Sequence, residues 1–325
     1  MSSKEDVLGI DISKAKFDVA LLKGEHKIKS KVFANTPLGF AELQAWLNSH
    51  AVSNLHACME ATSIYGNALA RFLVAAGHKV SIVNPSRPKA FGRSELSRTK
   101  TDRADAKVIA RFCAALHPAA WTPPAVEIEQ LQALVHRLDC LSAMQQQEQN
   151  RLETVDSILV DAISTHIDFL KAQIADTKAL IRKHFDQHPH LKEQRDLLTS
   201  IPGIAETTAT VILAEIRDVS TFDSAAQLAA FAGLTPQEFS SGSSVRGKPR
   251  LSKIGNSRLR KALYMPAIVA RRYNPPILAF CDRLLAKGKS KMAVVGAAMH
   301  KLLRQVFGVL KSRKPFDPYF LPISP

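Results

Sequence analysis

The stretch VLGIDISKAKFDVALL, residues 7–22, decides the fold of the N-terminal part of the chain. Apolar residues dominate 7–12 and 17–22, which predicts two strands joined by a tight connection, and 27–34 predicts a third strand. An acid, Asp11, lies near the end of the first of these strands. The N-terminal part therefore begins with an antiparallel meander that places a carboxylate close to a strand end.

Helical and strand-like segments alternate after this meander. The sequence predicts a helix over 37–47, a strand over 55–60, a helix over 65–76, a strand over 79–83 and a helix that begins near Thr101 or Asp102. Three antiparallel strands followed by such alternating units imply a mixed sheet flanked by helices. The Pro-Pro break in WTPPAVE, 121–127, ends this domain, which we place at 1–122.

Three further acids fall at matching places in this arrangement. Glu60 ends the strand over 55–60, and Asp102 and Asp105 lie in the first turn of the helix within TKTDRADAKVIARF, 99–112. Acids in a first turn are common, because they cap the helix and suit its dipole. Helix capping does not account for Asp11 and Glu60 at strand ends, so the four acids predict a site for a hard divalent ion, Mg²⁺ or Mn²⁺.

This order of elements with these acids resembles the RNase H-like fold, in particular RuvC-type nuclease domains. That resemblance implies acids that bind divalent metal and position a phosphodiester. The run GIDISKAKFDVALL also resembles the first phosphate-binding motif of actin-like sugar kinases. Those enzymes need a second Gly-rich phosphate loop, and this chain has only 14 glycines and no Gly-Gly pair.

The middle of the chain, 123–192, predicts long helices. Leucines and a valine recur at spacings of three and four, at positions 131, 134, 138, 141, 152, 155 and 159. This heptad-like pattern is interrupted at 145–150, where Gln predominates. The heptads are too few to choose between an intramolecular helical hairpin and a coiled coil that pairs subunits.

The C-terminal region, 193–325, opens with LLTSIPGIAETTATVILAEI, 197–216, which resembles a helix-hairpin-helix. A Pro-Gly turn of this type offers backbone amides at a helix N-terminus to a phosphate. Ala205 replaces the usual second glycine of the turn. Phosphate contact and a purely structural turn both remain open from the sequence.

The excess of positive over negative charge lies entirely in this C-terminal part. The chain has a net charge of +15, and residues 241–325 carry 18 Lys or Arg against only Asp282 and Asp317. Such a block is the electrostatic footprint of a nucleic-acid partner, although an acidic membrane surface or an acidic protein would also attract it. The four cysteines are far apart, which fits a reducing cytoplasm, and no apolar run approaches the length of a membrane span.

A serine-rich loop within 231–267 precedes a basic segment. Its serines are Ser240, Ser241, Ser243 and Ser244, and the nearby cations are Arg246, Lys248 and Arg250. A hydroxyl that attacks a phosphodiester needs activation, and cations stabilise the charge that develops. These requirements alone choose no nucleophile among the four serines.

The ordered combination of motifs resembles the insertion-sequence "one-ten" family of transposases. It consists of the Asp, Glu, Asp, Asp set, a coiled middle, a Pro-Gly hairpin, and a serine-glycine followed by K-x-G-N-x-x-L-R at 253–260. The resemblance covers essentially the whole chain. It implies metal-binding acids at Asp11, Glu60, Asp102 and Asp105, and a nucleophilic serine at Ser241, directly before Gly242.

The resemblance also implies an activity and partners. Members of this family recombine DNA through a transient phosphoserine link, and a noncoding bridge RNA specifies target and donor DNA. It implies a tetramer in which acids and serine meet across a subunit boundary. The nearest alternative is a RuvC-like endonuclease that uses metal-activated water, with Ser241 as a loop residue. A non-catalytic nucleic-acid-binding protein or RNA chaperone is less consistent with the acids, because acids near a phosphate repel DNA unless metal neutralises them.

Overall fold

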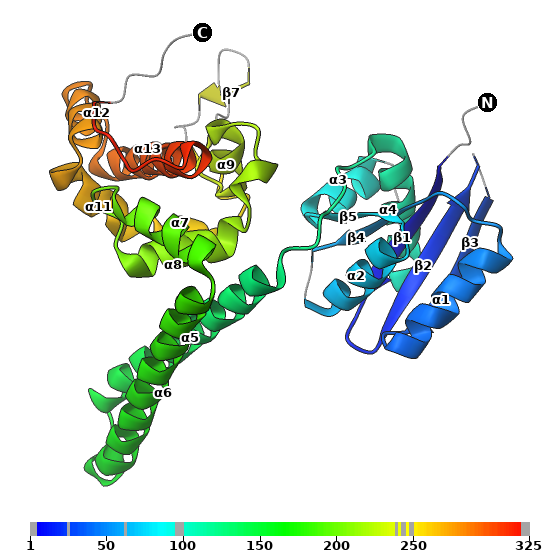
Figure 1. Cartoon of the computed structure of the whole chain (residues 1–325), viewed down its shortest axis with the longest axis horizontal. Coiled ribbons are helices and arrows are strands. Elements are labelled where there is room, and N and C mark those ends of the chain that lie inside the picture. Colours follow the sequence, from blue (N-terminus) through cyan, green and yellow to red (C-terminus); the bar gives the residue numbers. More distant parts are fainter. Residues whose placement is uncertain are drawn as a thin grey trace. The chain divides into compact units, whose positions relative to one another are not determined.

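The computed structural model describes residues 5–24, 27–61, 64–94, 101–237, 240–241, 245–246 and 250–319. The chain divides into two compact units, Met1–Pro123 and Pro124–Pro325 (Figure 1). Each unit has its own hydrophobic core, and each is described by itself below.

The N-terminal unit is built on a five-stranded mixed sheet. Its strands are β1 (Asp6–Ile12), β2 (Lys16–Lys23), β3 (Lys27–Ala34), β4 (Leu55–Glu60) and β5 (Lys79–Val83). They lie in the order β3-β2-β1-β4-β5, with β1, β4 and β5 parallel to one another and β2 antiparallel to both β1 and β3. The predicted RNase H-like fold is confirmed.

Helices cover both faces of this sheet (Figure 1). They are α1 (Pro37–Ser49), the short turn η1 (Ile64–Gly66), α2 (Asn67–Ala75), α3 (Ser86–Ser94) and α4 (Asp102–Leu116). Apolar residues of α1 and α2 share a core with Leu8, Ile10 and Phe17 on one face, whereas α4 packs on the other face with Val7 and Ala20. Two successive residues of a strand point to opposite faces, which is why the sheet has a separate core on each side.

The sequence prediction missed α3. Its residues, SRPKAFGRS, include Pro88 and Gly92 and have few apolar side chains, so no helical period is visible. Phe91 nevertheless packs beside Phe112 of α4, with ring centroids 5.9 Å apart. Tertiary packing therefore supplies the stability that the local sequence does not predict.

Gly9 sets the distance between β1 and α4. A Cβ atom at Gly9 would lie 2.1 Å from the carbonyl oxygen of Ala106 and 2.3 Å from the amide nitrogen of Ala110. These are backbone atoms of α4, so no side-chain rotation relieves the clash. Only glycine allows the helix to approach the strand this closely.

Gly9→Ala is therefore expected to lower the free energy of unfolding of the N-terminal unit by about 3 kcal/mol, the upper range for an overpacked core. The measurement is urea unfolding followed by a signal from Trp46 or Trp121. Gly24→Ala is the control, because a Cβ there meets nothing within 4 Å and only the positive φ of +66° opposes it. That variant should cost about 1 kcal/mol, and equal losses for the two variants would contradict the packing role of Gly9.

The C-terminal unit is mainly helical, as predicted. Its helices are α5 (Val126–Leu152), α6 (Val160–Gln187), α7 (Pro189–Thr199), α8 (Glu206–Ile216), α9 (Ala225–Phe231), α10 (Ser257–Ala262), α11 (Tyr264–Tyr273), α12 (Pro275–Ala286) and α13 (Lys291–Ser312), with short turns η2 (Ser157–Leu159) and η3 (Val219–Thr221). One core extends from Leu131 of α5 and Phe185 of α6 to Leu302 of α13. The long helices and the compact helical part thus share one core.

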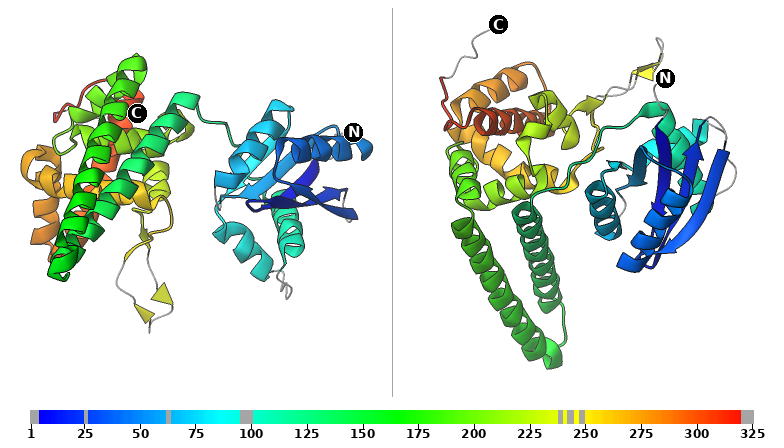
Figure 2. Two further views of the ribbon diagram at one scale, coloured as in Figure 1. Left: turned by 90° about the horizontal axis from the view of Figure 1, so that it is seen from below. Right: turned by 45° about the vertical axis from the view of Figure 1, so that its right-hand side comes forward.

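The helices α5 and α6 form an intramolecular hairpin, in which they lie side by side (Figure 2). The interruption predicted at 145–150 is wrong, because α5 continues without a break to Leu152. Gln and Glu are good helix formers, so a polar stretch weakens the heptad pattern without ending the helix. The chain turns only at 153–156, before η2.

The Pro-Gly turn between α7 and α8 is held by packing. Gly203 has φ +104°, and a Cβ there would lie 2.8 Å from the carbonyl oxygen of Pro266 and 2.9 Å from Cβ of Ala270, both in α11. The neighbouring Ile201 and Ile204 are buried in the core. The close approach of α11 thus explains this glycine without a phosphate.

Helix α13 is long and apolar enough to cross a membrane by length and composition alone. However, 56% of its most apolar window is buried within the unit. Its buried side chains include Val294, Leu302, Leu303 and Val306, which belong to the C-terminal core. Core packing accounts for its apolar character.

Candidate active site

The sheet and α4 bring the four predicted acids to one place in the N-terminal unit. Asp11 follows Gly9 by two residues and Glu60 follows Cys58 by two, so both acids project from the face that α4 covers. Asp102 and Asp105 occupy the first turn of α4. The charges of Asp102 and Asp105 both act on Asp11, so the start of the helix lies toward the end of β1 that bears Asp11.

Neither acid of α4 is its N-cap. Thr101 has that role, and its side-chain oxygen accepts a 3.2 Å hydrogen bond from the backbone amide of Ala104. The interpretation of Asp102 as a cap, which the sequence allowed, is wrong. Its carboxylate instead accepts a 3.1 Å hydrogen bond from the ammonium group of Lys16.

A fifth acid and a cation, which the sequence analysis did not identify, complete the cluster. Asp18 of β2 lies directly opposite Asp11 in the antiparallel ladder and is only 6% exposed. Lys16 lies 3.1 Å from Asp102 and 3.4 Å from Asp18, and the hydrogen bonds to these two acids raise its pKa. The signal in the sequence was Asp18 inside the apolar run FDVALL, because a charged side chain is rarely buried without a partner.

Negative charge accumulates at this cluster beyond what Lys16 neutralises. Burial, followed by the charges of Asp102, Asp105 and Asp18, raises the pKa of Asp11 from 3.8 to about 6. Burial, followed by the charges of Asp11 and Asp105, also raises the pKa of Glu60. The cluster therefore favours either protons or an additional cation.

The donor set fits a hard divalent cation. Every candidate ligand is a carboxylate, and Mg²⁺ and Mn²⁺ prefer oxygen ligands, of which proteins usually supply only a few. In the described part of the chain, no three of these acids bring their oxygens within 4.8 Å of one another. The carboxylates stand apart as mutually repelling anions, and a cation between them would remove that repulsion.

The raised pKa of Asp11 makes stability depend on pH in a defined direction. Folded Asp11 binds a proton up to about pH 6, whereas an unfolded Asp releases it near 3.8, so the unfolded state binds fewer protons between these values. Stability should therefore fall as pH rises from about 4 to 6, by about 1 kcal/mol after screening of this half-buried group. Urea unfolding at pH 4.5 and pH 7 measures this loss.

Mg²⁺ at pH 7 should restore most of the loss, because it binds the ionised acids of the folded state only. Asp11→Asn is the matched variant, since it cannot titrate and should show a flatter profile. An equally steep loss of stability in Asp11→Asn would assign the pH dependence to other groups.

Ser241 lies in a small two-stranded ribbon of the C-terminal unit. The outer ladder pairs β7 (Ser240–Ser241) with β8 (Val245–Arg246), and the inner ladder pairs β6 (Pro236–Gln237) with β9 (Arg250–Leu251). In the outer ladder, Ser241 is opposite Val245. Of the other residues named from the sequence, Gly242, Ser243, Ser244 and Lys248 lie outside the described residues.

The K-x-G-N segment, 253–256, anchors the base of this ribbon. Gly255 has φ +140°, and a Cβ there would lie 2.3 Å from the carbonyl oxygen of Phe231. The backbone amide of Asn256 donates a 2.6 Å hydrogen bond to that same oxygen. The glycine therefore permits a close crossing of two backbone segments, one of which leads into the ribbon and the other out of it.

Asn256 also links three helices through its side chain. Its oxygen accepts a 2.9 Å hydrogen bond from the amide of Leu259 and caps α10, and its amide group donates a 2.6 Å bond to Glu215 of α8. Glu215 is 4% exposed and shares a 2.9 Å hydrogen bond with His136 of α5. Neither Glu215 nor His136 lies in a recognisable motif, so their roles could not be predicted from the sequence.

Two family models match the chain. The one described as the transposase IS116/IS110/IS902 family matches residues 195–282. A DEDD transposase model of the IS110 type matches residues 8–158, which include all four predicted acids. The two matches together include both the acid cluster and the serine ribbon.

Two relatives match nearly the full chain, and others match part of it. The pilin gene-inverting proteins of Moraxella bovis and Moraxella lacunata are each 34% identical over 314 residues, which are 95% of this chain and 97% of theirs. An uncharacterized 43.6 kDa protein of insertion element IS110 from Streptomyces coelicolor is 31% identical over 47% of this chain and 36% of its own length. Among solved structures, Thermus thermophilus RuvC aligns with 35% of this chain and 98% of its own, at 16% identity and a TM-score of 0.27.

Proposed function

The chain belongs to the IS110 family of transposases, and we propose that it is a site-specific recombinase. In the proposed mechanism, Ser241 attacks DNA with the help of a divalent ion. The ion is held by Asp11, Glu60, Asp102 and Asp105. As a transposase of this family, it mobilises an insertion sequence. The observation that carries the proposed mechanism is the convergence of four acids at the carboxyl ends of β1 and β4 and the start of α4, where their charges act on Asp11 and Glu60.

The proposed reaction conserves the number of phosphodiester bonds. The hydroxyl oxygen of Ser241 bonds to phosphorus, the bond from phosphorus to one DNA oxygen breaks, and that DNA end leaves as a hydroxyl after taking up a proton. A hydroxyl of the second DNA then attacks the phosphoserine and releases Ser241. No external energy source is needed, because each step exchanges one phosphoester for another.

The residues of the chain have distinct parts in this proposal. The acids would hold Mg²⁺ or Mn²⁺, which when bound polarises the phosphate and stabilises the charge of the transition state. Lys16 balances part of the negative charge at Asp102 and Asp18 and fixes both carboxylates in place. Arg246 and Arg250 follow Ser241 closely in the sequence and are candidate cations for the phosphate under attack.

Target and donor DNA and a noncoding bridge RNA are the proposed partners. The support from this chain is electrostatic, since residues 241–325 carry 18 basic side chains and two acids. The Moraxella relatives are named for inverting a pilin gene. Strand exchange through a phosphoserine can produce an inversion as well as an insertion, because the two outcomes differ only in how the two DNA sites are arranged.

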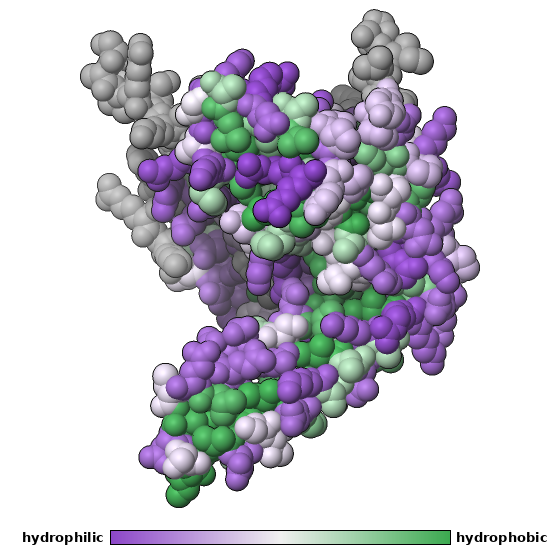
Figure 3. All heavy atoms as spheres, turned by 90° about the vertical axis from the view of Figure 1, so that its left-hand side faces the viewer, coloured by the Kyte–Doolittle hydropathy of each residue, from purple (hydrophilic) through white to green (hydrophobic). Residues whose placement is uncertain are grey.

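A homo-oligomer, proposed as a tetramer, is supported by exposed apolar side chains on the helical hairpin. Ile158 is 84% exposed, Phe169 58% and Leu180 53%. Figure 3 shows hydrophobic side chains gathered near the end of this hairpin. A second subunit that covers these residues would bury apolar surface, and recombination also requires several DNA ends to be held together.

The basic surface leads to a prediction about salt. Lys287, Lys289 and Lys291 are exposed, and we expect their replacement by Gln to weaken the salt dependence of DNA binding. The slope of log binding constant against log salt concentration should fall in magnitude by about 2 to 3, because each phosphate contact contributes about 0.9 to it. Fluorescence anisotropy with duplex DNA gives this slope. Gln at the exposed Lys171, Lys178 and Lys183 of α6 is the control, and a similar reduction there would place the nucleic-acid surface on the hairpin.

A direct test of the function uses DNA that carries the ends of the element and a target site. Incubation with Mg²⁺ and the RNA transcribed beside the element ends should give recombined DNA, and omission of the RNA should abolish it. DNA cleavage with hydrolysed ends and no joined product would favour the alternative, a RuvC-like endonuclease that uses metal-activated water.

A further inference from the structure

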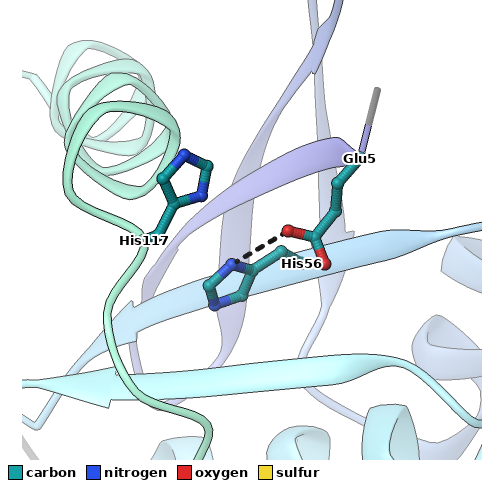
Figure 4. Close-up of side chains that lie close together, drawn as sticks. All are labelled: Glu5, His56 and His117. Atoms are coloured by element: carbon teal, nitrogen blue, oxygen red, sulfur yellow. Dashed lines mark ion pairs between the residues drawn. The ribbon is translucent and has the colours of Figure 1, made fainter. Parts of the chain in front are cut away.

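A second group of ligand-type side chains lies at the opposite end of the sheet face that carries the acids. It consists of Glu5, just before β1, His56 in β4, and His117, at the end of α4 (Figure 4). Their ligand atoms all lie within 4.8 Å of one another. His56 and Glu60 are four residues apart in one strand, so this group is about 13 Å from the acid cluster.

The hydrogen bonds of His56 fix which ring nitrogen carries a proton. His56 is fully buried, and its Nε2 lies 2.7 Å from Oγ of Ser81. The single hydroxyl proton of Ser81 points to backbone carbonyls, at 3.0 Å for Pro118 and 2.8 Å for Ala119. The Ser81 oxygen therefore accepts from Nε2–H, which leaves a lone pair on Nδ1 of the neutral ring.

This lone pair points at another acceptor. Nδ1 of His56 is buried and has no hydrogen-bond partner among the described residues. It faces Oε2 of Glu5 at 3.6 Å, which is too long for a hydrogen bond. Two ligands at about 2.1 Å from a tetrahedral ion are separated by about 3.4 Å, so the observed spacing suits a shared cation.

We propose that Glu5, His56 and His117 bind a zinc ion. Two imidazoles and one carboxylate are typical zinc ligands, and this set leaves the fourth tetrahedral position for water. Imidazole is a poor ligand for Mg²⁺, so the group selects a different ion from the all-carboxylate cluster. Ser81 supplies the outer hydrogen bond that orients a metal-binding histidine and fixes its tautomer.

The zinc ion has a structural role in this unit. It ties the residue before β1, the strand β4 and the C-terminal end of α4 together, and the other end of α4 carries Asp102 and Asp105. His117 contributes from a left-handed backbone conformation, φ +41°, directly after the helix. The ion therefore fixes α4 on the sheet from the end that is remote from the acids.

The test uses the full chain, freed of metal by a chelator and then titrated with Zn²⁺ in competition with a chromophoric chelator. The wild type should bind one Zn²⁺ per chain at this site and unfold at a temperature several degrees higher when zinc is present. Co²⁺ in place of Zn²⁺ should give the intense visible bands of a four-coordinate ion. His117→Ala removes an exposed ligand and should lower zinc affinity at least 100-fold, with loss of the stabilisation and of the bands.

His190→Ala is the matched control. His190 also faces a glutamate, Glu127, at 3.6 Å, yet the described part of the chain brings no third ligand to that pair. This variant should keep the zinc affinity of the wild type. Asp11→Ala should also keep the zinc affinity of the wild type, because Asp11 belongs to the acid cluster and not to the zinc site. The zinc site and the proposed recombinase mechanism can therefore fail independently of each other.

The contrary result is equally clear. If Zn²⁺ neither stabilises the wild type nor binds it more tightly than it binds His117→Ala, these three side chains form no zinc site. The zinc assignment is then wrong.

Discussion

Asp11→Asn should abolish DNA cleavage while the N-terminal unit stays folded and becomes more stable at pH 7. The amide keeps the shape of the carboxylate but removes the charge that Asp102, Asp105 and Asp18 oppose. The loss of one metal ligand removes several kcal/mol of transition-state stabilisation, so the rate should fall by about 1,000-fold or more. Activity and stability thus change in opposite directions, which a merely structural role of Asp11 does not produce.

The measurement combines a cleavage assay in Mg²⁺ with urea unfolding at pH 7. Asp6→Asn is the control, because Asp6 begins the same strand at the end remote from the cluster, and it should leave cleavage unchanged. Glu60→Gln and Asp102→Asn should behave like Asp11→Asn. Wild-type cleavage by Asp11→Asn in Mg²⁺ would show that the acid cluster has no catalytic role.

Ser241→Ala should eliminate both the covalent protein–DNA adduct and the recombined product. Without the hydroxyl no phosphoserine forms, and a methyl group offers no other route for strand exchange. Ser240→Ala is the matched control, since Ser240 is the adjacent residue of the same short strand. It should retain most of the activity.

The adduct is measured with a DNA substrate nicked beside the cleavage site, so that the cut end diffuses away and the protein stays attached. Denaturing gels then separate the adduct from free protein. Continued DNA cleavage by Ser241→Ala, with no adduct in the wild type, would identify the enzyme as a hydrolytic nuclease.

The sheet was predictable from the sequence because its signals are local. Apolar runs such as 7–12 and 55–60 have the length of buried strands, and Asp11 and Glu60 mark their ends. The register that places Asp18 opposite Asp11 depends on the turn between β1 and β2, which the pattern does not specify. Lys16 and Asp18 were therefore missed although they lie close to Asp11 in the sequence.

The rest of the site depends on contacts between distant segments. Glu215, His136 and Asn256 meet only because α5, α8 and α10 pack together. In the same way, Glu5, His56 and His117 are far apart in the sequence and form no spacing motif. Ser241 was chosen among four serines by family resemblance, because chemistry alone gives each of them a hydroxyl and nearby cations.

In the proposed mechanism, Ser241 becomes linked to DNA in a reaction that needs the acid cluster. The most direct measurement is to digest the trapped adduct with protease and nuclease and to locate the nucleotide-bearing residue by mass spectrometry. We expect a nucleotide on Ser241, formed in Mg²⁺ by the wild type and absent from Asp11→Asn. A nucleotide on another residue, or cleaved DNA with no linked peptide, would contradict it.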